Sequence, residues 1–181
     1  MKTTTNIGKP GLKPSLALNI NQAVDEAHII MDIGLSHTKI GFAKDPVPKH
    51  MIPTPLSMVK AMRAAISSTD SATFAKLFSD TRQLQLEIEE FLSQIFYHLL
   101  QTNPLEKAIV VVETFMGLRP LYEAIGHVCF KKFACRDVYF VLGNATPLYV
   151  TGMDSGLMVD IGYQQAQILP IVRGKLCMEG F

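Results

Sequence analysis

Long apolar runs, basic tracts and an excess of one charge are all missing from this sequence, and each absence excludes a class of protein. No apolar segment approaches the ~18 residues of a membrane-spanning helix, so we expect no membrane span. Its 17 basic and 16 acidic residues give a net charge of +1, which offers no electrostatic footprint for nucleic acid or for an anionic membrane. The N-terminus also lacks the apolar block of a signal peptide, which favours the cytoplasm.

Cysteine is scarce as well. Cys129, Cys135 and Cys177 are odd in number and have no metal-ligand spacing with the five histidines, which favours buried thiols over a disulfide or a metal site. What the sequence does have is a hydrophobic fraction of 48% and a charged fraction of 18%, as in packed globular proteins. Its 181 residues suffice for one sizeable core, or for one domain and an incomplete second.

The beginning of the chain divides into an irregular part and a hairpin. Residues 1–27 are rich in Gly, Pro, Thr and Asn without a sustained period, which predicts a flexible N-terminal tail, with a partner-binding arm as the alternative. Ile29 to Ile33 and Thr38 to Ala43 then read as two strands joined by a turn at Gly34. The proline-rich segment "KDPVPKHMIPTP" allows only an edge strand.

Helical and strand patterns alternate further along the chain. Within residues 54–80 "LSMVKAMRAAI" is only weakly helical, whereas a clear apolar stripe predicts a helix through Leu84, Ile88, Phe91, Ile95 and Leu99. "AIVVVE" is typical of a strand covered on both faces, "RPLYEAIGHVCFKKF" of a helix and "DVYFVL" of a second buried strand. "ATPLYVTG" predicts a short helix, and Gly156 to Val172 a closing hairpin. The alternation predicts an α/β fold whose mixed sheet combines parallel strands, antiparallel hairpins and flanking helices.

One pattern occurs twice, as "IIMDIGLSHTKIGF" and as "LMVDIGYQQAQILP", so that Asp32 matches Asp160 and Gly34 matches Gly162. A glycine at the turn lets backbone N–H groups approach a phosphate, and an aspartate at the strand end can organise Mg²⁺ and its waters. Lys39 can reach a phosphate as a point charge. Two ordinary turns are the alternative, because Asp and Gly are common in turns.

The order and spacing of these motifs resemble the first half of the actin fold, the ribonuclease H-like fold of actin, actin-related proteins, Hsp70 and sugar kinases. "DIGLSHTKIGFAKD" resembles the first phosphate loop and "DIGYQQAQILPIVRG" the second. The resemblance spans Ala27 to Phe181 and is greatest to actin-related proteins, above all to those at the pointed end of dynactin. It implies an actin-like first domain over residues 28–155. Residues 156–181 would then be the second phosphate-loop hairpin, which starts an incomplete second domain.

The resemblance also implies a site for ATP or ADP with magnesium. The matching positions for nucleotide are Asp32, Gly34, Ser36, Lys39, Asp160 and Gly162, with Asp32 and Asp160 expected to hold Mg²⁺ through water. Leu35 replaces a small hydroxyl residue of the first loop, and Tyr163 and Gln164 replace an acid and a glycine of the second.

Two further departures concern the attacking water. Gly143 and Gln167 stand where the family has the glutamine and the histidine that position it. Such sites act mainly through positioning and electrostatics, so the loss of both groups removes most of the rate. We therefore expect hydrolysis to be lost and any nucleotide to be bound weakly.

The interval 54–107 is shorter than, and poorly matched to, the small subdomain that grips the next protomer in actin. A subunit without that grip joins a filament through one end only, and a head-to-tail filament stays open until it is blocked. The resemblance therefore implies a non-catalytic subunit capping dynactin's pointed end and supporting dynein-based microtubule transport. Its partners would be actin-like filament subunits and other pointed-end subunits of dynactin. An active ATPase of the superfamily and a nuclear actin-related protein of a chromatin-remodelling complex are the alternatives.

An incomplete second domain has a physical consequence for its first hairpin. The hairpin would expose apolar side chains that a complete domain covers, and we expect these to include Val159, Ile161, Leu169 and Ile171. Unpaired strand edges would add to the effect. We therefore expect the isolated chain to be poorly soluble or oligomeric.

Overall fold

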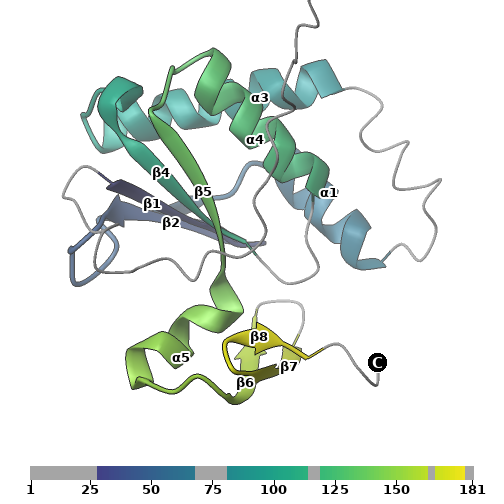
Figure 1. Cartoon of the computed structure of the whole chain (residues 1–181). Helices are drawn as coiled ribbons and strands as arrows, with labels where there is room; N and C mark the ends of the chain where they lie inside the picture. The colour runs from purple at the N-terminus through teal and green to yellow at the C-terminus, as the bar shows by residue number, and fades with distance from the viewer. Residues whose placement is uncertain (1–27, 68–80, 114–118, 163–165, 178–181) are drawn as a thin grey trace, which may run out of the picture.

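The structure, a computed structural model, describes residues 28–67, 81–113, 119–162 and 166–177 (Figure 1). The predicted tail over residues 1–27 lies outside the described residues. So do Tyr163 and Gln164 of the second loop, and most of the segment "AAISSTDSATFAKLF" in the divergent interval. The described residues form a five-stranded sheet with helices on one face, and a separate three-stranded sheet beyond one end of it.

The large sheet has the strand order β3-β2-β1-β4-β5. Its strands are β1 (His28–Ile33), β2 (His37–Phe42), β3 (His50–Pro53), β4 (Ala108–Glu113) and β5 (Asp137–Leu142). β1 runs parallel to β4, and β4 parallel to β5, while β2 pairs antiparallel with both β1 and β3. The predicted mixed sheet, the hairpin around Gly34 and the edge strand are thereby confirmed.

The helices that accompany the large sheet lie together on one side of it, and with it they form the first unit of the fold (Figure 1). They are α1 (Leu56–Ser67), α3 (Thr81–Ser93), which continues into the π-helical turn η1 (Gln94–Leu99), and α4 (Arg119–Lys131), with a short 3-10 turn η2 (Pro104–Glu106) before β4. The predicted stripe is confirmed, since Ile88, Phe91 and Ile95 are buried in the core. α1 is a full helix despite its weak pattern, because Met58 and Met62 are buried in the same core and packing supplies what the local sequence does not.

The predicted burial of two strands, β4 and β5, is wrong. β4 is not covered on both faces by the described residues: Ile109 and Val111 are buried towards the helices, but Val110 and Val112 are only half-buried. The six residues of β5 are all half-buried, because this strand forms an edge of the sheet. A β-branched run therefore does not by itself reveal how many layers cover a strand.

The second unit follows β5 directly. It consists of the 3-10 turn η3 (Gly143–Ala145), α5 (Thr146–Thr151) and the antiparallel strands β6 (Gly156–Ile161), β7 (Ala166–Val172) and β8 (Lys175–Leu176). The closing hairpin is confirmed, but it forms its own sheet, β6-β7-β8, rather than extending the first. η3 and α5 carry the chain away from β5, and Leu148 of α5 lies against Gly156 of β6. A domain boundary at residue 156 stays a prediction.

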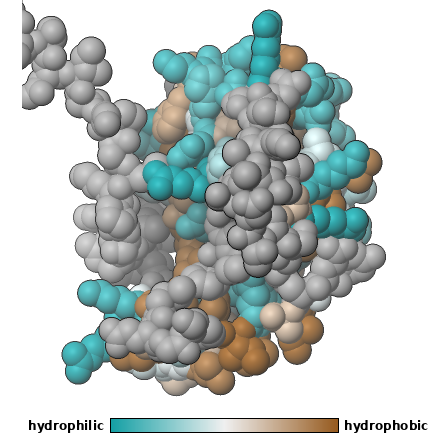
Figure 2. All heavy atoms as spheres, turned by 90° about the vertical axis from the view of Figure 1, so that its right-hand side faces the viewer, coloured by the Kyte–Doolittle hydropathy of each residue, from teal (hydrophilic) through white to brown (hydrophobic). Residues whose placement is uncertain are grey.

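The apolar side chains of the closing hairpin are exposed only in part. Val159 and Ile161 are 53% and 81% exposed, so their predicted exposure is confirmed. Figure 2 shows hydrophobic atoms gathered at the lower end of the molecule, where Figure 1 places β6–β8. The predicted exposure of Leu169 and Ile171 is wrong, because these residues are 4% and 2% exposed on the side that η3 and α5 contact.

Candidate functional site

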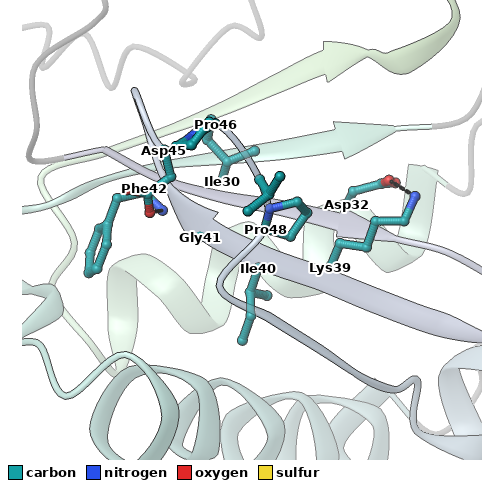
Figure 3. Close-up of a pocket in the computed structure, with 10 residues that line it drawn as sticks. Ile30, Asp32, Lys39, Ile40, Gly41, Phe42, Asp45, Pro46 and Pro48 are labelled. Carbon is teal, nitrogen blue, oxygen red and sulfur yellow. Dashed lines mark hydrogen bonds and ion pairs between the residues drawn. The ribbon is translucent and has the colours of Figure 1, made fainter.

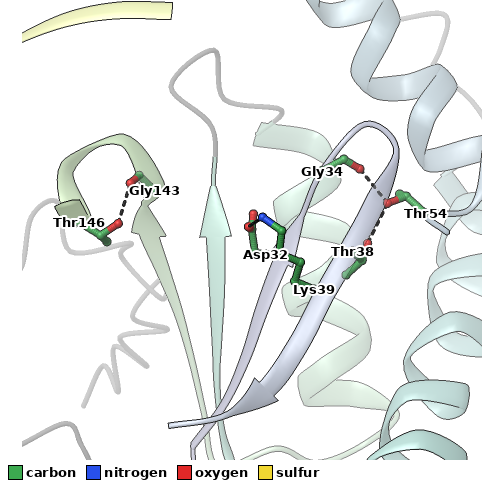
Figure 4. Close-up of polar contacts among 7 residues, drawn as sticks. All are labelled: Asp32, Gly34, Thr38, Lys39, Thr54, Gly143 and Thr146. Carbon is green, nitrogen blue, oxygen red and sulfur yellow. Dashed lines mark hydrogen bonds and ion pairs between the residues drawn. The ribbon is translucent and has the colours of Figure 1, made fainter. Parts of the chain in front are cut away.

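The candidate site lies at the carboxyl ends of the parallel strands. Because β1, β4 and β5 are parallel, the turn at Gly34, the end of β4 at Glu113 and the turn at Gly143 come to the same edge of the sheet (Figure 4). Ligands of open α/β sheets bind outside this edge. The first phosphate-loop motif and the position of the missing glutamine are therefore brought to one place.

The first loop is a tight turn that requires glycine. The N–H of Gly34 donates to the carbonyl oxygen of His37 at 3.1 Å, and a Cβ at Gly34 would lie only 2.9 Å from the same oxygen. The carbonyl of Gly34 accepts a hydrogen bond from the Thr54 hydroxyl at 2.7 Å, and that hydroxyl also lies 2.9 Å from the buried hydroxyl of Thr38. Thr38 and Thr54 thus fix the turn (Figure 4).

The outer side of this turn retains groups that suit a phosphate. Among the described residues, the backbone N–H groups of Leu35 and Ser36 donate to no acceptor, and the Ser36 hydroxyl lies 2.8 Å from Nδ1 of His37. The side chain of Leu35 packs against the core instead of projecting from the loop. The replacement of a hydroxyl residue at position 35 therefore removes a phosphate contact without blocking the loop.

Asp32 and Lys39 are cross-strand neighbours, and their side chains form an ion pair with 3.1 Å between Nζ and Oδ2. Both side chains are about half exposed, on the face of the hairpin that points away from the helices. They line part of a pocket of about 200 Å³, together with Ile30, Ile40, Gly41, Phe42, Asp45, Pro46, Val47 and Pro48 (Figure 3). The ion pair engages one of the three donors of the Lys39 ammonium, so Lys39 can contact a phosphate while it remains paired with Asp32.

The second loop is less complete. Asp160 lies opposite Gln167 at the end of β6 and is exposed, and its side chain has no hydrogen bond or ion pair in the part of the chain that the structure describes. Gly162 is exposed just beyond it. Within the described ranges no group of three or more His, Cys, Asp or Glu side chains could hold a metal ion. The structure thus gathers Asp32, Gly34, Ser36 and Lys39 in one hairpin, and a magnesium site shared between Asp32 and Asp160 stays a prediction.

Position 143, where the resemblance implies a glutamine, has no room for a side chain larger than that of glycine. A Cβ at Gly143 would lie 2.7 Å from Cγ1 of Val112 and 3.4 Å from the carbonyl oxygen of Glu113. The carbonyl of Gly143 accepts a hydrogen bond from the Thr146 hydroxyl at 2.7 Å, which holds the turn close to β4 (Figure 4). Any larger residue at position 143 must displace β4 or rotate a stiff β-branched side chain.

The position of the missing histidine is occupied by a structural contact. Nδ2 of the buried Asn144 donates to Oε1 of Gln167 at 3.0 Å, which ties the turn after β5 to β7. Nε2 of Gln167 is buried and has no hydrogen-bond partner among the described residues. Gln167 thus lies next to the turn that contains Gly143, and its side-chain oxygen is engaged by Asn144 of that turn.

Sequence reasoning missed three residues at this edge: Thr38, Thr54 and Glu113. The two threonines bond across 16 residues of chain, and the proline-rich segment that contains Thr54 indicates only an edge strand. Partial burial raises the pKa of the Glu113 carboxyl, which weakens its tendency to carry negative charge beside a phosphate site.

Comparison with known proteins decides the family, because the Actin family model matches residues 24–180. This chain belongs to the actin family. It is 25% identical to actin-related protein 10 of Dictyostelium discoideum over 166 residues, which are 82% of this chain and 35% of that protein. It is 22% identical to actin-like protein 7A of Bos taurus, over 81% of this chain and 37% of that protein.

A third relative is actin-related protein 2 of Schizosaccharomyces pombe, which is 22% identical over 82% of this chain and 42% of its own length. The chain thus spans between 35% and 42% of the length of these relatives. The expected actin-family fold is confirmed, with its mixed sheet and flanking helices. No helix in the described ranges is both long and apolar enough to cross a membrane.

Proposed function

We propose that this chain is a non-catalytic actin-related subunit that caps the pointed end of the dynactin filament in the cytoplasm and so supports dynein-based microtubule transport. The observation that carries the non-catalytic part is the state of the two water-positioning sites. Gly143 has no room for a larger residue beside Val112, and Gln167 is engaged by Asn144. A site that acts mainly by positioning water has little rate left without both groups.

Loss of hydrolysis has a direct test. The purified chain should release no phosphate from Mg-ATP above background. Turnover comparable to that of actin, abolished by Asp160→Ala, would instead establish the active-ATPase alternative.

Nucleotide binding is expected to be weak. Gly34, Ser36 and Lys39 supply the phosphate side of a site, but Lys39 is paired with Asp32, and no described hydrogen bond or ion pair joins Asp160 to them. We expect a Kd in the micromolar range or weaker, a binding free energy no better than about −8 kcal/mol. Calorimetry with Mg-ATP measures it, and nanomolar binding would contradict this part of the proposal.

Filament capping is supported by the path of the chain after β3. That strand ends at Pro53 and α1 begins at Leu56, and α1 immediately buries Met58 and Met62 in the core. The first part of the divergent interval therefore packs on the main sheet, while residues 68–80 of the same interval lie outside the described residues. A subunit that offers only one of the two head-to-tail contacts stops the growth of an open filament.

Capping can be tested on filaments with one end blocked. With barbed ends blocked, the chain should slow elongation at pointed ends when it is far less abundant than free subunits. With pointed ends blocked, barbed-end elongation should not change. Equal slowing at both ends would indicate sequestration of free subunits and would contradict capping. Co-purification with dynactin's pointed-end subunits, rather than with a chromatin-remodelling complex, tests the assignment of partners.

A further inference from the structure

Two of the three cysteines meet where α4 ends and β5 begins. Cys129 is 0% and Cys135 is 5% exposed, so the predicted burial of the thiols is confirmed for these two, whereas Cys177 is half-buried. All three are free thiols. The pair lies before Asp137, the first residue of β5, and thus at the edge of the sheet opposite to the candidate nucleotide site. In Figure 1 this junction lies at the top of β5, and the second unit lies below it.

The backbone of this junction folds back onto the end of the helix. α4 ends at Lys131, and Ala134 then adopts the left-handed conformation, with a φ of 48°, that commonly terminates helices. As a result the N–H of Cys135 donates to the carbonyl oxygen of Cys129 at 3.0 Å. Residues joined by a backbone hydrogen bond have Cα atoms roughly 5–6 Å apart. That separation lies within the range of about 4.4–6.8 Å that a disulfide spans.

The side chains of the two cysteines are also in contact. The thiol of Cys129 donates a hydrogen bond to the sulfur of Cys135, and this bond is the largest cause that raises the pKa of Cys129 and lowers the pKa of Cys135. Burial raises the pKa of Cys129 further and opposes the lowering at Cys135. Because the thiolate is the reactive form of cysteine, Cys135 is the nucleophile of the pair and Cys129 is its neighbouring thiol.

Neighbouring contacts hold the turn between the two cysteines in place. Nζ of Lys132 lies 2.8 Å from Oε2 of Glu89 in α3. The ring of Phe133 packs edge-on against that of Phe96 in η1, with 5.1 Å between the ring centroids. A thiol held beside another thiol has a high effective concentration for reaction with it, which favours a bond within the chain over one between chains.

A structural zinc site is a poorer use of the same pair. Such a site needs four ligands from Cys, His, Asp or Glu. Within the described ranges no group of three or more of these side chains could hold a metal ion. The pair therefore suits a reaction between its two sulfurs better than coordination of zinc.

We propose that Cys129 and Cys135 form a reversible disulfide when the protein meets hydrogen peroxide. The Cys135 thiolate attacks one peroxide oxygen, the O–O bond breaks, and Cys135 becomes a sulfenic acid while hydroxide leaves and takes up a proton. The sulfur of Cys129 then attacks the sulfenic sulfur, and its proton leaves with the hydroxyl group as water. Two thiols and one peroxide thus give one disulfide and two waters, and each sulfur loses one electron to the peroxide.

The disulfide would protect Cys135 from further oxidation. A sulfenic acid without a nearby thiol continues to the irreversible sulfinic acid, whereas a disulfide returns to two thiols when a dithiol reductant is added. The disulfide would also tie the end of α4 to the start of β5. This chemistry needs neither nucleotide nor filament, so it does not depend on the proposed function.

Peptide mapping of the full chain tests the proposal. The folded chain is treated with hydrogen peroxide and denatured, and its remaining thiols are blocked with N-ethylmaleimide. We expect one adduct, at Cys177, in place of the three of the untreated chain, and dithiothreitol should restore all three. Trypsin cleaves after Lys131 and Lys132, between Cys129 and Cys135, so the disulfide appears as two linked peptides. Three adducts after treatment, or a disulfide that involves Cys177, would overturn the proposal.

Variants assign the roles within the pair. Cys177→Ser is the matched control and should form the disulfide to the same extent as the unsubstituted chain. In Cys129→Ala the sulfenic acid of Cys135 has no partner thiol, so labelling of Cys135 by dimedone during peroxide treatment should rise at least tenfold. Circular dichroism melting checks that each variant is folded, and mapping of the unsubstituted chain is decisive even where a variant does not fold. Equal dimedone labelling of Cys129→Ala and the unsubstituted chain would overturn the proposal, as would loss of the linked peptides in Cys177→Ser.

Discussion

The two hairpins that carry the repeated motif have the same apolar alternation but opposite environments. "IIMDIG" and "LMVDIG" align without a gap, so that Ile29, Met31 and Ile33 correspond to Leu157, Val159 and Ile161. The first three are 0%, 0% and 3% exposed, whereas the second three are 63%, 53% and 81% exposed. The same alternation thus places matched apolar residues in the core in one hairpin and on the surface in the other.

The neighbours of each hairpin explain this difference. β1 lies between β2 and β4, and its inward residues pack under the helices α1, α3 and α4. β6 is an edge strand of a small sheet, and η3 and α5 contact the side that carries Leu169 and Ile171. An apolar alternation therefore predicts a strand, but the layers packed against it decide which of its two faces is buried.

The largest expected effect is the difference in stability loss between the two isoleucines at matched positions of the motif, Ile33 and Ile161. Ile33→Ala should cost about 2–5 kcal/mol of unfolding free energy, because Ile33 is 3% exposed and its truncation leaves a cavity. Ile161→Ala should cost less than about 1 kcal/mol, because Ile161 is already in solvent and loses only strand preference. Urea denaturation of both variants measures the difference. Equal costs would show that Ile161 is buried in solution, by a partner or by a second copy.

The comparison of the two hairpins also shows which features of the fold could be predicted from the sequence alone. The helix through Leu84, Ile88 and Phe91 was predictable because its stripe is periodic, and the Asp32–Lys39 pair follows from the register of a tight hairpin. The helix α1 was not, because its burial comes from packing on the sheet. Which face of β6 is covered depends on η3 and α5, and no local pattern contains that information.

Some features of the candidate site could likewise be predicted from the sequence, and others could not. Glycine at position 34 was predictable from the needs of a turn. The reason for glycine at position 143 was not, because the obstacle is Val112 on a neighbouring strand. The contacts Thr38–Thr54 and Asn144–Gln167 join residues distant in sequence, and only the folded chain brings them together.

The second prediction concerns the junction between the two hairpins. Gly143→Ala should destabilise the chain by about 1–3 kcal/mol, because its new Cβ would lie 2.7 Å from Cγ1 of Val112. Adding Val112→Ala removes that methyl group, so the double variant should lose less than the sum of the two single losses. Gly126→Ala is the control, since a Cβ there meets only ordinary contacts at 3.7 Å in a helix. Strict additivity of the two losses would contradict the steric account.

The third prediction breaks the polar link between the turn after β5 and the second hairpin. Asn144→Ala would leave both amide atoms of Gln167 without a described partner, at a cost of about 1–2 kcal/mol. The loss should appear first as faster hydrogen exchange in β6 and β7, because these strands depend most on the link. The double variant with Gln167→Ala should cost less than the two single changes together. Unchanged exchange in β6 and β7 would show that α5 alone positions the hairpin.

The smallest expected effect compares the two matched aspartates. Asp32 pairs with Lys39 across the hairpin at 3.1 Å, but both side chains are about half exposed, so Asp32→Asn should cost only about 0.2–1 kcal/mol. Asp160 has no partner in the described structure, so Asp160→Asn should leave the stability unchanged at any salt concentration. In 1 M NaCl the Debye length falls to about 3 Å, so the cost of Asp32→Asn should shrink there. Urea denaturation at low and high salt separates the two variants. If Asp160→Asn proved as costly as Asp32→Asn and equally sensitive to salt, Asp160 would have a cationic partner in solution, and the two hairpins would be electrostatically alike despite their different burial.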